Sequence, residues 1–343
     1  MNMESPPDDL MPRFAHNEDI ETATDDICEE DSFVRLIDPE TGRLSAGLSA
    51  QCRCPLCDQA SDGTVFAERQ GFTYARCPNC TMVYMSPRLI DEIHDHRMRN
   101  DPNARNSFHA QLAQAENPED RSLKALIMRL KAAVPRGKLI DIGCGLGKFL
   151  LLGRTAGYVV SGIELHAFAA AQARSNGLTV LEKDLQDLDL APGSIDLVTS
   201  FDLIGKLQTP LAFLREVHRV LKPKGRLLLT CPNMESLAAQ LLGVENVDAL
   251  EAPTQINWFT RQTLTAMLRQ ANFRVLDISS NGMSDFQTLR MQLERTQQSL
   301  PPFIQKILWQ TAPETEELRK DLLALIKRHA LGGSLIAECA PEK

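Results

Sequence analysis

The stretch K-L-I-D-I-G-C-G-L-G-K-F-L, residues 138–150, decides the fold of the surrounding chain. Apolar Leu139 and Ile140 run into the acidic Asp141, and three glycines at alternate positions lead into an apolar segment that starts at Lys148. This order predicts a buried parallel strand, a turn without bulky side chains and a helix N-terminus, so that a ligand can lie against bare backbone. A dinucleotide-binding fingerprint would need a third glycine at position 148, where this chain has lysine.

Strands and helices alternate along the chain after this stretch. Strands are predicted at 138–142, 159–163, 179–182, 195–200, 226–230, 274–279 and 332–340. Helices are predicted at 148–156, 167–175, 211–221 and 260–270, with two or three more within 284–330. Such alternation is typical of an α/β fold in which helices cover both faces of a largely parallel sheet.

An acid followed by three alternating glycines resembles the first motif of the class I S-adenosylmethionine-dependent methyltransferases. The four residues are Asp141, Gly143, Gly145 and Gly147. Residues 52–88 and 138–280 resemble the zinc-ribbon start and the catalytic core of a bacterial subset, which includes sugar C-methyltransferases and relatives that act on small molecules and lipids. The resemblance implies methyl transfer from S-adenosylmethionine, and a Rossmann-like seven-stranded sheet whose final strand, 334–340, is antiparallel.

The resemblance also assigns parts of the co-substrate to residues at the ends of the predicted strands. The acid of the first motif holds the ammonium group or a bridging water, and the glycines admit the amino-acid moiety. Glu164 can accept both ribose hydroxyls, and Asp184 or a neighbouring amide can reach the adenine amino group. The predicted cofactor-binding residues are Asp141, Gly143, Gly145, Gly147, Glu164, Asp184, Leu185 and Phe201.

Two short cysteine pairs precede the sheet. Cys54 and Cys57 are separated by two residues, as are Cys77 and Cys80, and nineteen residues lie between the pairs. Two such knuckles can hold one Zn²⁺ ion, which then supplies folding energy to a small module. Four protein ligands leave no open coordination position, so the predicted zinc site is structural. Cys52 lies nearby, but the repeated C-P-x-C pattern favours the other four cysteines.

Three histidines occur in the polar, largely helical segment between the cysteines and the sheet, namely His94, His96 and His109. A second metal site is one interpretation of this group. Because four thiolates already provide a metal site, solvated histidines are the favoured interpretation.

The acceptor side departs from the family pattern in two places. Members of the subset usually carry a Glu-His pair after the fourth strand, and often a His before the W-F-T segment. This chain has Gly205 and Lys206 at the first place and Gln255 at the second. No obvious general base remains, and the hypothesis is therefore methylation of an already reactive nucleophile. The acceptor-side candidates are Lys206, Asp202 and Tyr84, taken as catalytic, together with Gln255, Asn257 and Trp258.

Charge and hydropathy restrict the partners. The net charge is −8, and residues 1–40 carry −11 from thirteen acidic and two basic residues, which leaves +3 for the rest. This near-neutral remainder and an aromatic content of 5% disfavour an RNA methyltransferase. The sequence shows neither a signal peptide nor a run long enough to span a membrane, so a cytoplasmic protein with a small-molecule acceptor is predicted.

Four parts are predicted along the chain. Residues 1–50 form an acidic, disordered tail, 51–90 the zinc ribbon, 91–136 a helical linker and 137–343 the methyltransferase domain. A helical insertion at 284–330 would cover the acceptor pocket or form a homodimer contact. The tail is alternatively a docking segment for a partner protein. The alternative to an enzyme is a catalytically inactive scaffold that keeps the ligand fold.

Overall fold

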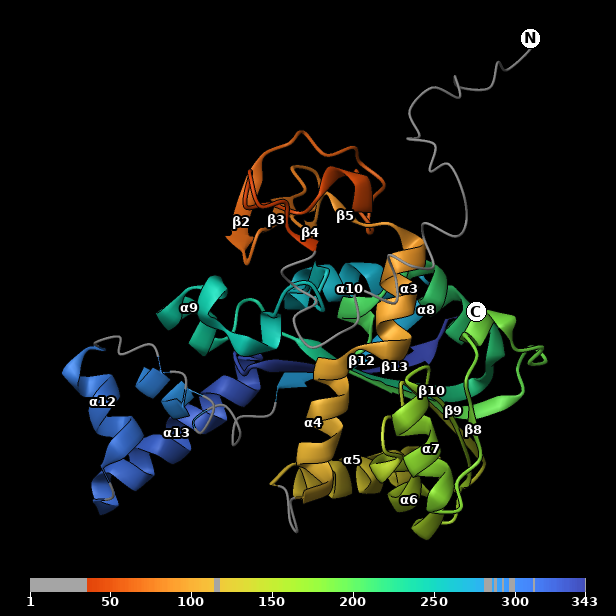
Figure 1. The fold of residues 1–343 in the computed structure, drawn as a ribbon. Helices are drawn as coiled ribbons and strands as arrows, with labels where there is room; N and C mark the ends of the chain where they lie inside the picture. The colour runs from red at the N-terminus through yellow and green to blue at the C-terminus, as the bar shows by residue number, and fades with distance from the viewer. Residues whose placement is uncertain are drawn as a thin grey trace.

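The computed structural model describes residues 36–113, 118–280, 286, 289–291, 293–295, 300–310 and 312–342 (Figure 1). The acid-rich stretch Glu18 to Asp31, with most of the predicted tail, lies outside the described residues. Within the described part, no helix is long and apolar enough to cross a membrane.

A seven-stranded sheet forms the centre of the molecule, in the order β12-β13-β10-β9-β6-β7-β8 (Figure 1). Its strands are β6 (Lys138–Ile142), β7 (Val159–Ile163), β8 (Val180–Leu181), β9 (Ile195–Phe201), β10 (Leu221–Pro232), β12 (Phe273–Ser280) and β13 (Ser334–Pro341). Strands β6 to β10 pair in parallel, whereas β13 runs antiparallel to both β10 and β12. The predicted sheet with an antiparallel last strand is therefore confirmed.

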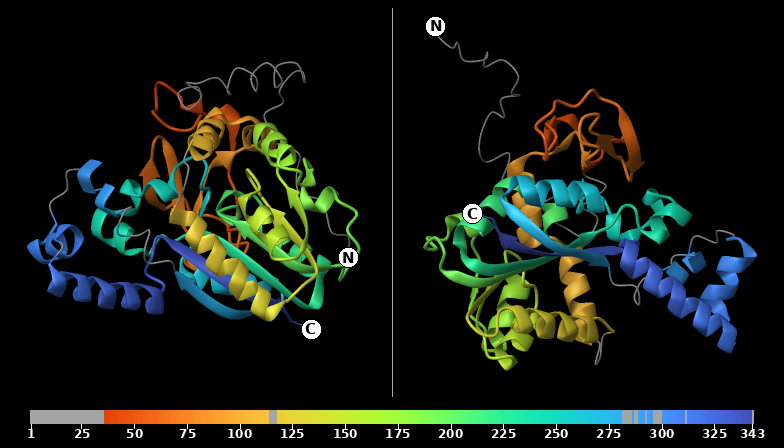
Figure 2. Two further views of the ribbon diagram at one scale, coloured as in Figure 1. Left: turned by 90° about the horizontal axis from the view of Figure 1, so that it is seen from below. Right: turned by 180° about the vertical axis from the view of Figure 1, so that it is seen from behind.

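Apolar side chains alternate between the two faces of the sheet, and each face packs in a separate hydrophobic core. On β10, Leu228 packs into a core with helices α5 (Pro118–Ala133), α6 (Lys148–Thr155) and α7 (Ala167–Ser175). The neighbouring Leu227 and Leu229 pack into a second core with α8 (Pro210–Val220) and α10 (Arg261–Gln270). The period of two along a strand produces this division, and the helices lie on both faces as predicted (Figure 2).

The cysteine-bearing module is continuous with the main domain. Its antiparallel sheet has the order β11-β4-β3-β2, formed by β2 (Val65–Arg69), β3 (Phe72–Arg76), β4 (Val83–Met85) and β11 (Asn257–Trp258). Strand β11 belongs to the segment that follows β10, and Trp258 stacks on Tyr74 of β3 with ring centroids 3.9 Å apart. A strand pair of β1 (Ser49–Ala50) and β5 (Arg88–Leu89) closes the module. The module thus completes its sheet with a strand from the methyltransferase domain.

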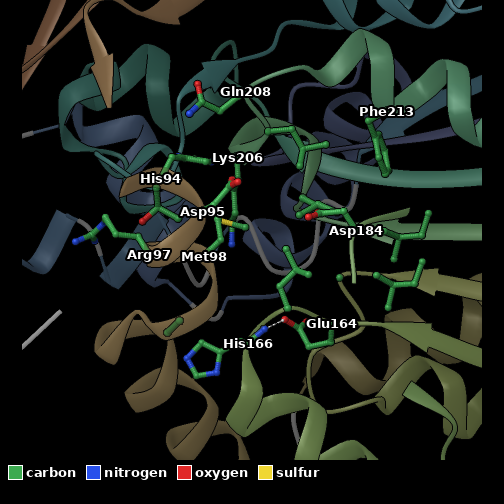
Figure 3. Close-up of a pocket in the computed structure, with 18 of the residues that line it drawn as sticks. His94, Asp95, Arg97, Met98, Glu164, His166, Asp184, Lys206, Gln208 and Phe213 are labelled. Carbon is green, nitrogen blue, oxygen red and sulfur yellow. Dashed lines mark hydrogen bonds between the residues drawn. The ribbon is translucent and has the colours of Figure 1, made fainter. Parts of the chain in front are cut away.

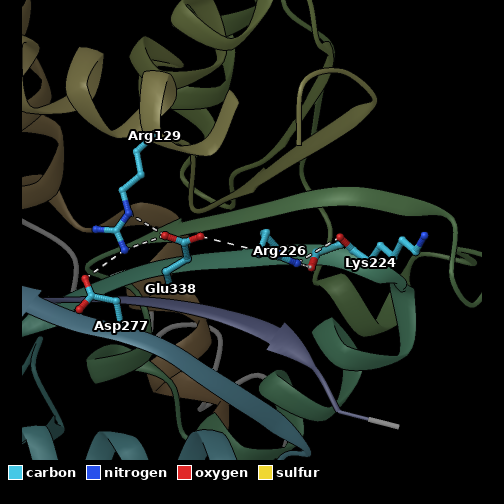
Figure 4. A network of polar contacts seen from close by, with 6 residues as sticks. Arg129, Lys224, Arg226, Asp277 and Glu338 are labelled. Carbon is cyan, nitrogen blue, oxygen red and sulfur yellow. Dashed lines mark hydrogen bonds and ion pairs between the residues drawn. The ribbon is translucent and has the colours of Figure 1, made fainter. Parts of the chain in front are cut away.

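Three helices lead from this module to the sheet: α3 (Asp91–Asn100), α4 (Pro102–Ala113) and α5. Arg129 of α5 donates from Nε to Glu338 Oε2 at 2.6 Å and from Nη2 to Asp277 Oδ2 at 3.0 Å (Figure 4). Arg226 approaches the other Glu338 oxygen at 3.8 Å. Because Glu338 lies on β13 and Asp277 on β12, this network fastens the linker helix to the far strands of the sheet.

The remaining elements lie beyond the strand ends. Helix α9 (Leu237–Leu242) follows β10, with single 3₁₀ turns at Val244–Asn246 and Asp248–Leu250. Helices α12 (Pro302–Trp309) and α13 (Pro313–His329) form a further apolar cluster that includes Leu242 of α9. They project to one side of the sheet, at the left of Figure 1.

Candidate functional site

A cavity of about 370 Å³ opens at the carboxyl ends of β6, β7, β8 and β9 (Figure 3). β6, β7 and β9 each contribute a residue to its wall, and the segment after β8 contributes Asp184 and Leu185, as expected for a ligand site in an open α/β sheet. Helices α3 and α4 form the opposite wall, which includes Arg97, Met98 and Phe108. The loop Leu203 to Thr209, after β9, closes a third side. The linker helices therefore complete the cavity that the sheet begins.

The glycine turn after β6 supplies bare backbone to this cavity. Gly143 and Gly145 line it with φ angles of 74° and 51°, in the left-handed region that glycine adopts freely. Gly147 also has a positive φ, but it does not line the cavity. A side chain at Gly147 would overlap Leu178 instead, so this glycine permits α6 to pack against α7 and the turn that follows it. Its predicted part in ligand binding stays a prediction.

Glu164 is held rigidly at the end of β7. Its Oε2 accepts from the Gly145 amide and its Oε1 accepts from the His166 amide, both at 2.8 Å. The side chain thereby ties the glycine turn to the start of α7, while it also lines the cavity. A carboxylate oxygen can accept more than one hydrogen bond, so both oxygens keep acceptor capacity for a ligand.

Asp141 occupies a different environment from the one that the motif implied. It is 1% exposed, does not line the cavity and accepts a 2.7 Å hydrogen bond from the Thr199 hydroxyl of β9. Burial raises the pKa of Asp141 to about 7, although the Thr199 hydrogen bond opposes the shift. Asp141 therefore joins β6 to β9 behind the glycine turn, and its role in holding the ammonium group or a bridging water stays a prediction.

The stability of the protein should fall as pH rises from about 4 to about 7, through the titration of Asp141. Its pKa is about 7 in the folded state against a reference of 3.8, so the unfolded chain releases the proton first in this window. The slope approaches about 1.4 kcal/mol per pH unit for one group. Asp141→Asn, which mimics the protonated acid, should remove this contribution, as measured by urea unfolding across the range. Equal slopes in both proteins would contradict the assignment.

Asp184, Leu185 and Phe201 line the cavity as predicted candidates. Arg99 of α3 approaches Asp184 Oδ2 at 3.3 Å. Burial raises the pKa of Asp184, and the Arg99 charge lowers it. Leu185 is buried beside it, and Phe201 packs on Phe149 with ring centroids 4.8 Å apart. Leu185 and Phe201 thus form an apolar part of the cavity wall next to Glu164, and Asp184 places a carboxylate at its edge.

The three catalytic candidates are not brought together. Asp202 and Lys206 line the cavity, and Asp202 Oδ1 accepts from the Thr230 hydroxyl at 3.0 Å. Burial raises the pKa of Asp202, while Thr230 and the Lys206 charge lower it. Tyr84 lies outside the cavity, 2% exposed and packed in the core beside the cysteines. Burial raises the pKa of Tyr84 to about 12, and its position gives it no contact with a ligand in the cavity.

The two departures from the family pattern touch each other. A Cβ at Gly205 would overlap Gln255 Oε1 and come within 3.1 Å of the Asn257 carbonyl. Gln255, Asn257 and Trp258 are all buried and none of them lines the cavity. The Asn257 side chain donates to the Leu207 carbonyl at 2.7 Å, which holds the loop after β9. These residues support the wall from behind, contrary to their predicted place on the acceptor side.

Replacing Gly205 by alanine should lower the free energy of unfolding by about 1–3 kcal/mol, the range for inserting a methyl group into a packed site. The same replacement should cost less in a Gln255→Ala background, because the closest overlap is then removed. Urea unfolding of the single and double variants measures this coupling. An equal cost in both backgrounds would show that Gln255 does not fill the space at Gly205.

Two buried histidines line the cavity at positions that the sequence did not predict to be part of the site. His94 is 7% exposed and His166 is 5% exposed, so the interpretation of His94 as a solvated residue is wrong. His166 Nε2 contacts the Asp101 carbonyl at 3.2 Å, and its Nδ1 has no hydrogen-bond partner among the described residues. A sequence signal existed for His166, which lies two residues after the strand-end acid Glu164. His94 sits in a polar helix whose burial depends on tertiary contacts.

The described residues of the helical insertion do not line the cavity. None of the described residues between 284 and 330 lines it, and α12 and α13 pack away from the strand ends that form it (Figure 2). That this segment covers the acceptor pocket therefore stays a prediction, whereas residues of α3 and α4 in the linker line the cavity.

The four predicted cysteines converge on one point. The ligand atoms of Cys54, Cys57, Cys77 and Cys80 all lie within 4.8 Å of one another, with Cys54 to Cys80 at 3.5 Å and Cys57 to Cys77 at 3.4 Å. A tetrahedral ion with Zn–S bonds of about 2.3 Å places its sulfurs about 3.8 Å apart, so the cluster fits zinc. Cys52 instead directs its thiol to the Met85 carbonyl at 3.2 Å, as expected for the residue left out of the set.

Comparison with known proteins identifies the domain. Residues 113–278 match the family described as a methyltransferase domain. The ubiquinone biosynthesis O-methyltransferase of Xanthomonas campestris pv. campestris (strain B100) is 29% identical over 161 residues, which cover 43% of this chain and 67% of that protein. The protein of the same name from Pseudomonas aeruginosa (strain LESB58) is 28% identical over 160 residues, which cover 43% of this chain and 69% of that protein. A solved S-adenosylmethionine-dependent methyltransferase from Mesorhizobium loti is 19% identical, with a TM-score of 0.42, over 62% of this chain and 96% of that one.

The chain carries a methyltransferase domain of the class I, S-adenosylmethionine-dependent type. The strand order, the glycine turn and the family match agree on this class. The relatives align with less than half of the chain, and the cysteine module precedes the matched domain.

Proposed function

We propose that the cavity binds S-adenosylmethionine along the carboxyl ends of β6, β7 and β8. Gly143 and Gly145 would receive the amino-acid moiety, and Glu164 the ribose hydroxyls. Asp184 and the Leu185 amide would face the adenine, with Phe201 at the sulfonium end. The rigid hold on Glu164 carries this proposal, because a carboxylate fixed by two amides is preorganised to accept hydroxyl hydrogen bonds. The orphan Nδ1 of His166 is a further buried polar group with capacity for a ligand contact.

The acceptor would enter between α3 and the loop after β9. Lys206, Gln208 and Thr209 line that side together with His94 and Met98 (Figure 3). The two relatives are named as O-methyltransferases, which supports a hydroxyl group on a small molecule as the acceptor. S-adenosylmethionine supplies an activated methyl group, so the chain's own contribution is alignment of the acceptor and removal of its proton.

The cysteine cluster would hold one structural Zn²⁺. Its four thiolates complete a tetrahedral set, so the ion offers no open position for catalysis. We assign residues 51–90 to this ribbon, 91–136 to the linker and 137–343 to the catalytic domain. Strand β11 of the last part would then be the joint between ribbon and enzyme. Docking of a partner through the acidic tail and assembly into a homodimer remain hypotheses from the sequence.

Isotope-labelled S-adenosylmethionine incubated with small-molecule extracts tests the assignment. We expect label in a hydroxyl-bearing product, and loss of most of it with Lys206→Ala, because Lys206 lines the acceptor side. The exposed Lys224, outside the cavity, provides the matched control variant Lys224→Ala. A protein that binds the donor and labels no extract would favour the inactive scaffold. Unchanged turnover by Lys206→Ala would remove Lys206 from the site.

A further inference from the structure

His94 projects from the linker into the acceptor side of the cavity. It belongs to α3, which precedes the methyltransferase domain, and it lies opposite the loop after β9 (Figure 3). Its side chain is largely buried, yet it forms part of the cavity wall. It therefore faces the loop after β9 from the opposite wall of the cavity.

The imidazole is held in place by that same loop. One ring nitrogen hydrogen-bonds to the Lys206 backbone carbonyl, so it carries the ring's N–H. A neutral imidazole then has an unprotonated second nitrogen with an available lone pair. The contact fixes the tautomer and links the orientation of the ring to the loop's position.

The surroundings keep this ring uncharged. Burial lowers the pKa of His94 to about 4, and the nearby charges of Arg88 and Arg97 lower it further, whereas the Lys206 carbonyl raises it. The other charged groups that line the same cavity are Asp95, Asp101, Glu164, Asp184, Asp202, Lys206 and Glu216. At neutral pH the imidazole is accordingly uncharged, with a free lone pair on its second nitrogen, and acts as a weak base.

Other groups on this side are less suited to that task. Lys206 is a donor without a lone pair while it is protonated. Asp202 already accepts from the Thr230 hydroxyl, and its backbone amide is bonded to the Thr230 carbonyl at 3.1 Å, so it is built into the support of the loop. Gly205 has no side chain, and Gln255 fills the adjoining space from behind.

We propose that His94 is the base that removes the acceptor's proton during methyl transfer. The inference rests on the proposed transfer to a hydroxyl group. The acceptor oxygen forms a bond to the methyl carbon while the bond from that carbon to the sulfonium sulfur breaks, and S-adenosylhomocysteine leaves. The hydroxyl proton passes to the free His94 nitrogen and then to solvent. As the new bond forms, the oxygen becomes positively charged and its proton strongly acidic, so a weak base suffices.

Two measurements test the proposal without knowledge of the natural acceptor. In protein with ¹⁵N-labelled histidine, the His94 resonances should show one neutral tautomer at pH 7 and should shift when S-adenosylhomocysteine is added. A charged ring at pH 7, or no response to a ligand that binds, would overturn the proposal. Absence of S-adenosylhomocysteine binding in calorimetry would instead overturn the proposed function.

A series of substituted phenols serves as the acceptor probe, with labelled S-adenosylmethionine. His94→Gln should lower turnover about 100-fold for phenols with a pKa near 10, and much less for nitrophenols that are already ionised at the assay pH. His96→Gln, on the same helix but outside the cavity lining, is the control. The proposal would be overturned if His94→Gln lowered the turnover of all phenols equally. It would also be overturned if Asp202→Asn, and not His94→Gln, lost turnover selectively with the phenols of high pKa. A wild-type protein that binds the donor but methylates no phenol would overturn it as well.

Discussion

Replacing Glu164 by alanine should weaken binding of S-adenosylmethionine by at least about 100-fold. The variant loses two charge-assisted contacts to the ribose in our assignment, each worth about 1.5–3 kcal/mol. It also loses the acceptor that holds the Gly145 and His166 amides, so the glycine turn is no longer fixed. Titration calorimetry of the purified variant measures the affinity directly.

The control for this experiment is Glu182→Ala. Glu182 lies just beyond β8, at the end of the neighbouring strand, and it does not line the cavity. Its replacement should leave donor affinity within a factor of a few. Wild-type affinity in a folded Glu164→Ala protein would mean that the ligand does not lie across the end of β7.

Replacing Cys54 by serine should abolish metal binding and unfold the cysteine module. Zinc contributes about 10–16 kcal/mol to the folding of small zinc-finger peptides, far more than so small a core supplies. The damage should extend to the cavity, because β4 of the module pairs with β11 and Arg88 donates to the Gln208 carbonyl at 2.9 Å. Zinc content, the melting temperature and donor affinity together measure these effects.

Cys52→Ser gives the matched control, since the Cys52 thiol contacts the Met85 carbonyl and lies outside the cluster. It should retain one equivalent of zinc and a nearly unchanged melting temperature. Wild-type protein purified under reducing conditions with less than half an equivalent of metal would contradict the zinc assignment. A Cys54→Ser variant that melts like the wild type would contradict its structural role.

The sheet was predictable because its strands are marked by local apolar runs, and these same residues are buried by tertiary contacts in the folded protein. β6 and β7 have the bounds predicted from the apolar runs before Asp141 and Glu164. The glycine turn, the cysteine pairs and the acids at the strand ends were also predictable from their spacing in the sequence. Gly143, Gly145 and Glu164 accordingly line one cavity. Chain order determines the position of such groups in a parallel sheet.

Residues whose roles depend on packing between distant segments could not be predicted in this way. Asp141 fits the motif, but its carboxylate accepts a hydrogen bond from the hydroxyl of Thr199 on β9. Tyr84 packs in the hydrophobic core beside the cysteines and does not reach the cavity. His94 is buried because the loop after β9 docks on α3, a contact between segments more than one hundred residues apart. The polar sequence of α3 gives no sign of that docking.

Titration of the wild-type protein with S-adenosylmethionine tests the central claim most directly. The cavity geometry predicts saturable binding of one molecule per chain, with a Kd between about 1 μM and 1 mM, the usual range for enzymes and their substrates. Binding should be competed by S-adenosylhomocysteine and should be lost in Glu164→Ala. No heat of binding at millimolar S-adenosylmethionine, from folded protein that contains its zinc, would contradict the account.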